Sequence, residues 1–235
     1  TADDFIYAWT RVLTPASGAK NSALLYHIEG AQEFYEGADA KPNMKAIDDH
    51  TVQFTLKQRV PYMMQLVAYS TYFPVRQDVV EADPEGWTRS PDTYIGTGPF
   101  RVTEMNLGEG FVFEKNPNYY GADNVKLDKL TFRLIPQQST ALAAMEAGDV
   151  DGIESVPASE VPRLSVESEA FLVIPSLGTT YAFFNPAASP VDDVKVRKAL
   201  SMAIDRQEIV EFVLQSADVP ATGLVPYGMN VAGED

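Results

Sequence analysis

The spacing of apolar residues changes repeatedly along the chain, and this predicts an α+β protein with helices and strands interspersed. Thr1 is a residue type that caps helix N-termini, and the apolar residues that follow it recur at helical spacing. We therefore expect a helix from the start of the chain. Two further helices are expected to abut at Asp205, which with Glu208 resembles a capping box. Helices are also predicted at residues 26–35, 61–69, 139–147 and 157–164.

Alternation of apolar and polar residues marks the expected strands. Residues 44–47 and 51–56 flank Asp48 and Asp49, which favour a turn, so this region predicts a β-hairpin. Phe132 and Leu134 are expected to face the core of a second sheet, because they alternate with polar residues. The strands of that sheet are predicted at residues 100–102, 111–113 and 130–134, and further strands at 150–153, 171–174 and 181–184.

The composition narrows the class of protein. A chain of 235 residues with 45% hydrophobic content can bury the core of one or two domains, and none of its apolar stretches approaches the ~20 residues of a spanning helix. Thirty-three acidic residues against eighteen basic ones give a formal charge of −15, which disfavours nucleic acid and anionic lipid as partners. The absence of cysteine excludes thiolate chemistry and disulfides.

Candidate catalytic residues are few. His27 and His50 are the only histidines, and the sequence has no thiol to pair with either, so no catalytic triad is predicted. His50 follows two acids at the predicted hairpin turn, where a solvated polar residue is expected, and His27 is expected to be satisfied by a neighbour on a helix. We therefore predict no catalytic residue, no metal site and no cofactor.

Seven segments, in this order, carry a resemblance to a known family. They are TADDFIYAWTR at 1–11, KAIDDHTV at 45–52, GTGPF at 96–100, KNPNYY at 115–120, MEAGDVD at 145–151, FNP at 184–186 and VKVRKALSMAIDR at 194–206. Together they resemble the family 5 extracellular solute-binding proteins, the oligopeptide- and dipeptide-binding receptors of bacterial ABC importers. Thr97 departs from the family pattern, which usually has asparagine there, so no polar role is assigned to it.

The resemblance implies an α/β (mixed α+β) fold of the periplasmic-binding-protein type, with two lobes and an extra domain inserted in the first. Residues 1–95 would be part of the inserted domain, 96–185 part of the lobe-one sheet and 186–235 the start of lobe two. The chain ends agree with an internal piece, because no start methionine or signal peptide precedes Thr1 and residues 219–235 are rich in connecting prolines and glycines. The family's acidic contact to a peptide amino terminus would lie outside this sequence.

The resemblance also implies a ligand site. Tyr181 and Phe183, two apart on a predicted strand, would face the cleft, with Phe183 offering an apolar pocket where the oligopeptide receptor carries an acid. Glu154 and Ser155 align with another ligand-lining stretch, and Tyr26 with an aromatic residue of the inserted domain. Core packing is the alternative for each of these side chains.

By the same resemblance the protein would capture short peptides outside the cytoplasmic membrane, in the periplasm or at the cell surface, and deliver them to the permease of an ABC importer. A signal or lipoprotein segment outside this sequence would anchor it. The alternatives are a receptor for a nickel chelate, haem or an oligosaccharide, a ligand-sensing domain for a signalling partner, and a hydrolase. Apolar surfaces are also expected to let the 235-residue chain self-associate.

Overall fold

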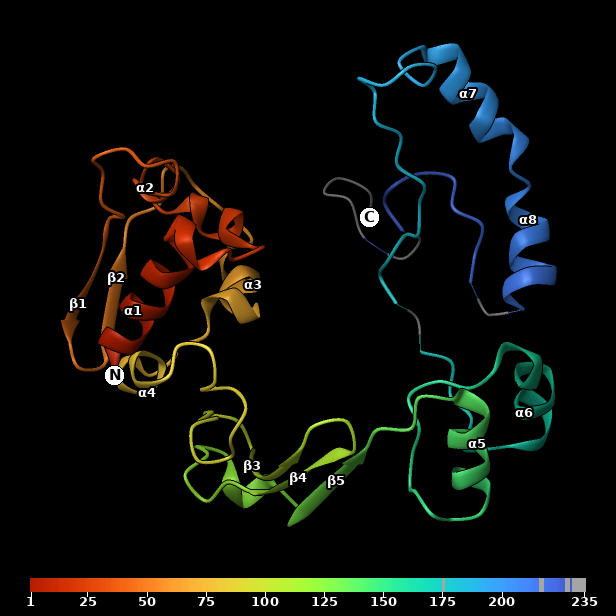
Figure 1. The fold of residues 1–235 in the computed structure, drawn as a ribbon, viewed down its shortest axis with the longest axis horizontal. Helices are drawn as coiled ribbons and strands as arrows, with labels where there is room; N and C mark the ends of the chain where they lie inside the picture. Colours follow the sequence, from red (N-terminus) through yellow and green to blue (C-terminus); the bar gives the residue numbers. More distant parts are fainter. Residues whose placement is uncertain (175, 216–217, 227–228, 230–235) are drawn as a thin grey trace. The chain divides into compact units, whose positions relative to one another are not determined.

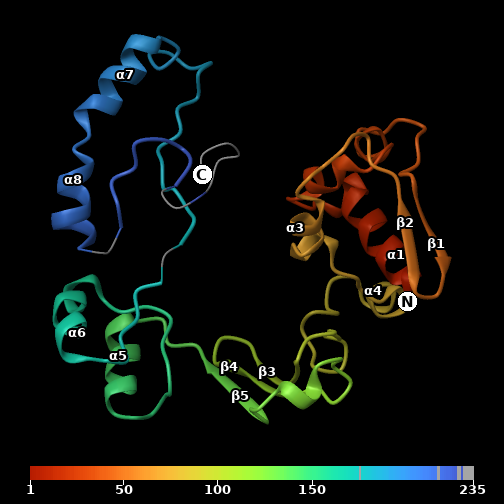
Figure 2. The same cartoon turned by 180° about the vertical axis from the view of Figure 1, so that it is seen from behind.

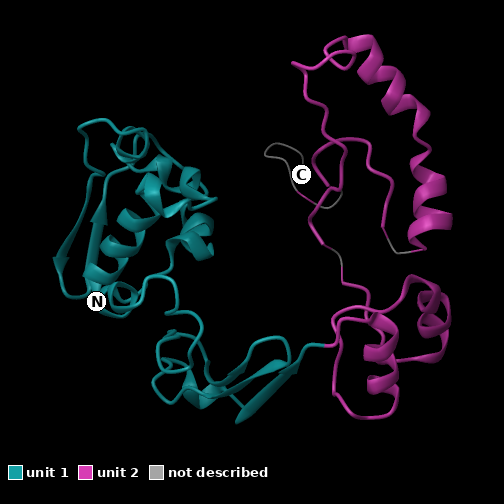
Figure 3. Cartoon of the chain, in the orientation of Figure 1, with its two compact units in different colours: residues 1–134 teal, residues 135–235 magenta. Residues whose placement is uncertain are grey.

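The computed structural model describes residues 1–174, 176–215, 218–226 and 229. It divides into two compact units, Thr1–Leu134 and Ile135–Asp235, which Figure 3 distinguishes by colour. Part of the predicted connection at the end of the chain, residues 227–228 and 230–235, lies outside the described residues.

The first unit opens with helix α1 (Ala2–Leu13), as predicted, and Thr1 is its N-cap residue. The Asp4 carboxylate accepts hydrogen bonds from the Thr1 amino group at 2.7 Å and from its Oγ1 at 2.8 Å. The hydrogen bond from the amino group, the one from Thr1 Oγ1 and the nearby positive charge of the N-terminus hold the pKa of Asp4 below its ordinary value. Carboxylates in the first turn also interact favourably with the positive end of the helix dipole. The helix therefore begins where the sequence predicts it.

The core of the first unit forms around Trp9. Its ring meets that of Phe54 edge to face with centroids 5.5 Å apart, and Leu13, Leu25 and Ile28 are fully buried beside it. Because large aromatic and branched side chains contribute most of the buried apolar area, this cluster is the main source of stability in the unit.

The predicted hairpin is confirmed as strands β1 (Met44–Asp48) and β2 (Thr51–Phe54), which pair antiparallel and lie against α1 (Figure 1, Figure 2). The main-chain N–H of Ala2 donates to the Asp49 carbonyl at 2.8 Å, so the hairpin turn is fixed to the start of the helix. The short elements of the unit are η1 (Pro15–Ser17), η2 (Ser22–His27), α2 (Ala31–Tyr35), α3 (Met63–Val67), η3 (Ser70–Tyr72) and α4 (Gln77–Ala82).

The prediction of one helix over residues 26–35 is wrong. Ile28 leaves the helical path to form an isolated antiparallel bridge with Leu56, and Gly30 then takes a left-handed conformation with φ of 78°. The chain therefore forms η2 before this break and α2 after it. A residue 28 positions away in sequence causes the break, which local spacing does not reveal.

The predicted second sheet is confirmed as β3 (Phe100–Asn106), β4 (Gly110–Lys115) and β5 (Lys129–Arg133), antiparallel in the order β3-β4-β5, with η4 (Ala122–Asn124) before β5. Phe132 and Leu134 do not face a core, contrary to expectation, since their side chains are 55% and 49% exposed. The Phe132 ring instead meets Phe113 on the neighbouring strand at 5.5 Å. On this face of the sheet, Phe132 packs against a side chain of the neighbouring strand.

Asn116 links the segment that precedes β3 to the turn that follows β4. It is buried, and its side-chain Nδ2 donates to the Gly98 carbonyl at 2.9 Å while its Oδ1 accepts from the main-chain N–H of Asn118 at 3.0 Å. Its own main-chain N–H donates to the Pro99 carbonyl at 2.9 Å. This buried amide therefore fixes the turn predicted at Asn116–Pro117–Asn118 against the segment that leads into β3.

The second unit begins with α5 (Gln138–Glu146), η5 (Ala158–Glu160) and α6 (Val161–Glu167), close to the predicted helices, and Leu142 and Leu164 are its buried side chains among the described residues. Then come α7 (Val194–Ala203), α8 (Arg206–Glu208) and the π-helix η6 (Ile209–Leu214). Asp205 accepts from the main-chain N–H of Glu208 at 3.0 Å, as its predicted capping role requires.

Three predicted strands, at residues 150–153, 171–174 and 181–184, are absent from the described residues, which are irregular or extended there. A strand needs a neighbour to pair with, and the described part of this unit contains no other strand. Leu172 and Ile174 are accordingly 74% and 81% exposed. Within the described residues no helix has the length and apolar character needed to cross a membrane.

Candidate functional site

Glu154 and Ser155 lie side by side in the loop between α5 and η5, and both are exposed. Gly148, with φ of 78°, ends α5 and turns the chain into this loop, while the main-chain N–H of Asp149 donates back to the Ala144 carbonyl at 2.8 Å. Ser155 Oγ accepts a hydrogen bond from Gln138 Nε2 at 3.1 Å. The loop is thus attached to α5 at its start and again beside Glu154.

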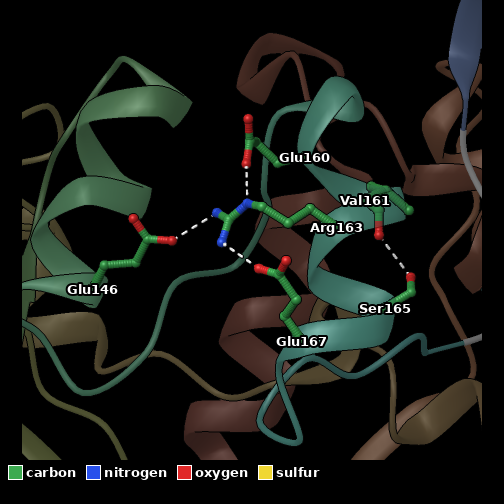
Figure 4. Close-up of polar contacts among 6 residues, drawn as sticks. All are labelled: Glu146, Glu160, Val161, Arg163, Ser165 and Glu167. Carbon is green, nitrogen blue, oxygen red and sulfur yellow. Dashed lines mark hydrogen bonds and ion pairs between the residues drawn. The ribbon is translucent and has the colours of Figure 1, made fainter.

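Arg163, on α6, binds three carboxylates that come from different elements (Figure 4). Its Nη2 lies 2.7 Å from Glu146 Oε1, its Nε 2.8 Å from Glu160 Oε2 and its Nη1 3.4 Å from Glu167 Oε2. The hydrogen bond to Glu146, followed by that to Glu160, raises the pKa of the guanidinium further above its ordinary value. The side chain therefore stays fully charged.

The α5–α6 region is strongly acidic. Between residues 138 and 167 Arg163 is the single basic residue, whereas the acids are Glu146, Asp149, Asp151, Glu154, Glu160 and Glu167. Arg163 pairs with three of them, and the acidic residues of the loop itself are exposed. A surface of this kind attracts cationic groups and repels anions.

Tyr181 and Phe183 lie in an extended segment, not in the predicted strand, and their side chains are 64% and 80% exposed. Neither therefore packs in a core. Among the described residues, 176–184 make no hydrogen bond with other main-chain groups, so their N–H and C=O groups are open to a partner. The segment can offer both aromatic area and main-chain pairing to a ligand.

Tyr26 belongs to the first unit, whereas the other four predicted residues belong to the second. Its ring is half-buried and lies 5.5 Å from that of Tyr35, tilted, against the core around Trp9. Within the second unit the structure brings Glu154 next to Ser155 and Tyr181 near Phe183 along the chain. No hydrogen bond or ring contact joins these two pairs in the described part of the unit.

An open groove of about 410 Å³ lies on the first unit, between the end of α1 and α4, and was not predicted from the sequence. Tyr7, Arg11, Glu81 and Pro84 are among its lining residues. Burial, followed by the nearby charge of Glu81, raises the pKa of Tyr7. Helical spacing could have placed Tyr7 and Arg11 on one face of α1, but the contribution of α4 depends on the tertiary fold.

Neither histidine lies in a catalytic arrangement among the described residues. The His27 ring meets Tyr62 edge to face at 5.7 Å, and the main-chain N–H of His50 donates to Asp48 Oδ1 at 2.9 Å in the hairpin turn. In the same residues no group of three or more His, Asp or Glu side chains is arranged to hold a metal ion.

The whole chain, residues 1–235, matches the model for the middle region of the bacterial extracellular solute-binding proteins, family 5. The chain belongs to this family. The chain is 34% identical over 230 residues to the dipeptide-binding protein DppE of Bacillus subtilis, and the match covers 97% of the chain and 42% of DppE. The family resemblance drawn from the seven segments is thereby confirmed.

Solved structures of family members have the same fold. The crystal structure of Haemophilus influenzae OppA in complex with RPPGFSPFR is 31% identical, with a TM-score of 0.86, and the match covers 96% of the chain and 45% of OppA. The Escherichia coli murein tripeptide binding protein MppA is 33% identical, with a TM-score of 0.87, and the match covers 97% of the chain and 45% of MppA. The predicted fold of the periplasmic-binding-protein type is confirmed, and the chain spans less than half the length of these relatives.

Proposed function

We propose that the chain is the middle part of a receptor that captures short peptides outside the cytoplasmic membrane and delivers them to the permease of an ABC importer. The observation that carries this proposal is the likeness to Haemophilus influenzae OppA, which binds RPPGFSPFR and shares both the fold and 31% of the aligned residues. Names of two further relatives, a dipeptide-binding and a murein tripeptide-binding protein, point to the same class of ligand.

The ligand contacts in this proposal come from the five predicted residues. Residues 176–184 would pair their open main-chain groups with an extended peptide, while Tyr181 and Phe183 would pack against its side chains. Glu154 and Ser155 would line the same ligand from their loop, and Tyr26, in the first unit, stays a predicted ligand contact. Main-chain pairing suits a receptor that accepts many sequences, because every peptide offers the same backbone groups.

Binding without cleavage is part of the proposal. His27 is packed on Tyr62, and His50 lies in a hairpin turn, so each has a structural setting that supports this reading. The relatives reported above are all binding proteins by name. A receptor releases its ligand unchanged, and we expect peptides to be recovered intact.

The division of the chain also enters the proposal. Residues 1–95 would belong to an inserted domain, 96–185 to the sheet of lobe one and 186–235 to the start of lobe two. A signal or lipoprotein segment elsewhere in the protein would hold the receptor outside the cytoplasmic membrane. Apolar side chains such as Leu172 and Ile174, exposed in the 235-residue chain, support self-association of that piece.

Calorimetric titration of the complete receptor tests the function. We expect heat of binding with a library of peptides of two to ten residues, and mass spectrometry should recover each peptide uncut after incubation. Parallel titrations use a nickel chelate, haem and an oligosaccharide. Binding of one of these with no response to any peptide would refute the peptide assignment, and appearance of cleavage products would refute the purely binding role.

A further inference from the structure

We propose that Arg163 is a positioning residue for the ligand site: it clasps α5 and η5, the two elements that flank the loop carrying Glu154 and Ser155. The inference rests on the proposed function, in which this loop lines the ligand. It concerns a side chain that the sequence resemblance does not assign to binding.

The clasp is visible in the bonds of one guanidinium group (Figure 4). Glu146 is the last residue of α5, directly before the loop, and Glu160 is the last residue of η5, the short helix directly after the loop. Arg163 Nη2 is 2.7 Å from one carboxylate and Nε is 2.8 Å from the other. The elements on both sides of the loop, α5 and η5, are therefore held by the same group.

The Arg163 guanidinium offsets electrostatic repulsion among the carboxylates that it binds. Without the cation, Glu146 and Glu160 would be two negative charges close together, with Glu167 as a third, and like charges at such range repel. Arg163 is the single basic residue between residues 138 and 167. A planar guanidinium presents donors in several directions at once, whereas a lysine ammonium is one compact charge, so arginine suits a three-carboxylate clasp better than lysine does.

The interior of the loop is fixed as well. Gln138 Nε2 donates to Ser155 Oγ at 3.1 Å, next to Glu154, and Gly148 sets the direction in which the chain leaves α5. With the flanking elements clasped and the middle attached, Glu154 has a defined position while its carboxylate remains exposed to a ligand. A loop that is ordered before binding loses less conformational entropy when the ligand arrives.

The first test measures the loop in the ligand-free complete receptor by amide hydrogen exchange of peptides spanning residues 143–160. Exchange there should rise about threefold to tenfold in R163M and E146Q, since each loses the link between α5 and α6. R163K should fall between these variants and the wild type. R101M is the matched control, because Arg101 is an exposed arginine whose ion pair with Glu114 spans 3.4 Å elsewhere in the chain. Unchanged exchange in R163M would overturn the proposal.

The second test asks whether the clasp acts through Glu154. In a double-mutant cycle on peptide affinity, E146Q should weaken binding about threefold to tenfold in the wild-type background and by less than twofold in the E154Q background. The positioning role would be overturned if E146Q lowered affinity equally in both backgrounds. It would also be overturned if E154Q alone lowered affinity and E146Q alone did not. A failure of the proposed function is distinguishable, because the wild-type receptor would then bind no peptide while the exchange measurement still reports on the clasp.

Discussion

Trp9 and Tyr72 are joined by two different interactions: the indole Nε1 donates to the Tyr72 carbonyl at 2.9 Å, and the two rings meet edge to face with centroids 5.5 Å apart. The Tyr72 hydroxyl then donates to the Leu24 carbonyl at 2.7 Å. Three segments distant in sequence, α1, η2 and η3, are connected through this pair. Polar ends on aromatic side chains thus give the core a specific geometry in addition to its buried area.

The hydroxyl of Tyr72 should contribute measurably to stability. Y72F leaves the ring in place but removes the partner of the Leu24 carbonyl, so we expect a loss of about 1 kcal/mol in the free energy of unfolding, measured with urea. Y69F is the control, because Tyr69 is 49% exposed whereas Tyr72 is buried. Equal stabilities of the two variants would show that the Leu24 carbonyl finds another donor.

The same hydroxyl predicts a dependence on alkaline pH. Burial raises the pKa of Tyr72 to about 12 from its ordinary value of 10.0, so the folded state holds the proton more tightly than the unfolded state does. This stabilisation is complete below pH 10 and is lost as the pH rises from 10 towards 12. Urea unfolding at pH 9 and pH 11 should show wild type losing about 1 kcal/mol more than Y72F; parallel losses would contradict the prediction.

Asn116 should be more sensitive to substitution than its exposed neighbour Asn118. N116A removes the donor to the Gly98 carbonyl and the acceptor for the Asn118 N–H, so two part-buried hydrogen bonds are lost, which should cost about 1–3 kcal/mol. N118A keeps the main-chain N–H that makes the contact and should cost less than about 0.5 kcal/mol. Hydrogen exchange across residues 98–118 gives the measurement, and similar protection in both variants would argue against the role of the buried amide.

Tyr181 should affect binding without affecting stability. Its ring is exposed in the chain, so Y181A should change the melting temperature little while lowering peptide affinity of the complete receptor about fivefold to thirtyfold, through lost apolar contact. F183A should behave in the same way. A large fall in melting temperature with unchanged affinity would instead place Tyr181 in the core of the complete protein.

The isolated chain should self-associate through its exposed apolar segment. Leu172 and Ile174 both present most of their side chains to solvent, and the net charge of −15 opposes but does not cover them. Light scattering on the 235-residue chain should give a mass above 25.8 kDa that rises with concentration, and L172K combined with I174K should lower it. A monomer at every concentration would refute this expectation.

Local pattern was sufficient where contacts are local. The alternation of Val52 and Phe54 predicted the hairpin, because its partner strand lies only a turn away, and the sheet of β3, β4 and β5 followed in the same way. The apolar segments at 171–174 and 181–184 have the same composition as strands, but pairing depends on a neighbour that the sequence pattern cannot specify. Their assignment as strands was therefore wrong for the described chain.

The residues of the candidate site were predicted from the sequence, whereas the contacts that support its loop were not. Family resemblance pointed to Glu154 and Ser155, and that choice stays a prediction. The convergence of Glu146, Glu160 and Glu167 on Arg163 depends on how α5 and α6 pack, which no spacing along one helix reveals. Only the two contacts within Glu160–Glu167 follow the i, i+3 and i, i+4 rule that a sequence shows.

Gly30, at the break between η2 and α2, sets a limit on how this region can vary. Its φ of 78° already disfavours any residue with a side chain, and a Cβ there would lie 2.5 Å from the Lys41 carbonyl oxygen, well inside van der Waals contact. Main chain on both sides is fixed, one by the Ile28–Leu56 bridge and the other by the start of α2. In a library that samples all amino acids at this codon, selection for folded protein should return glycine almost alone, even though the neighbouring Glu29 is exposed.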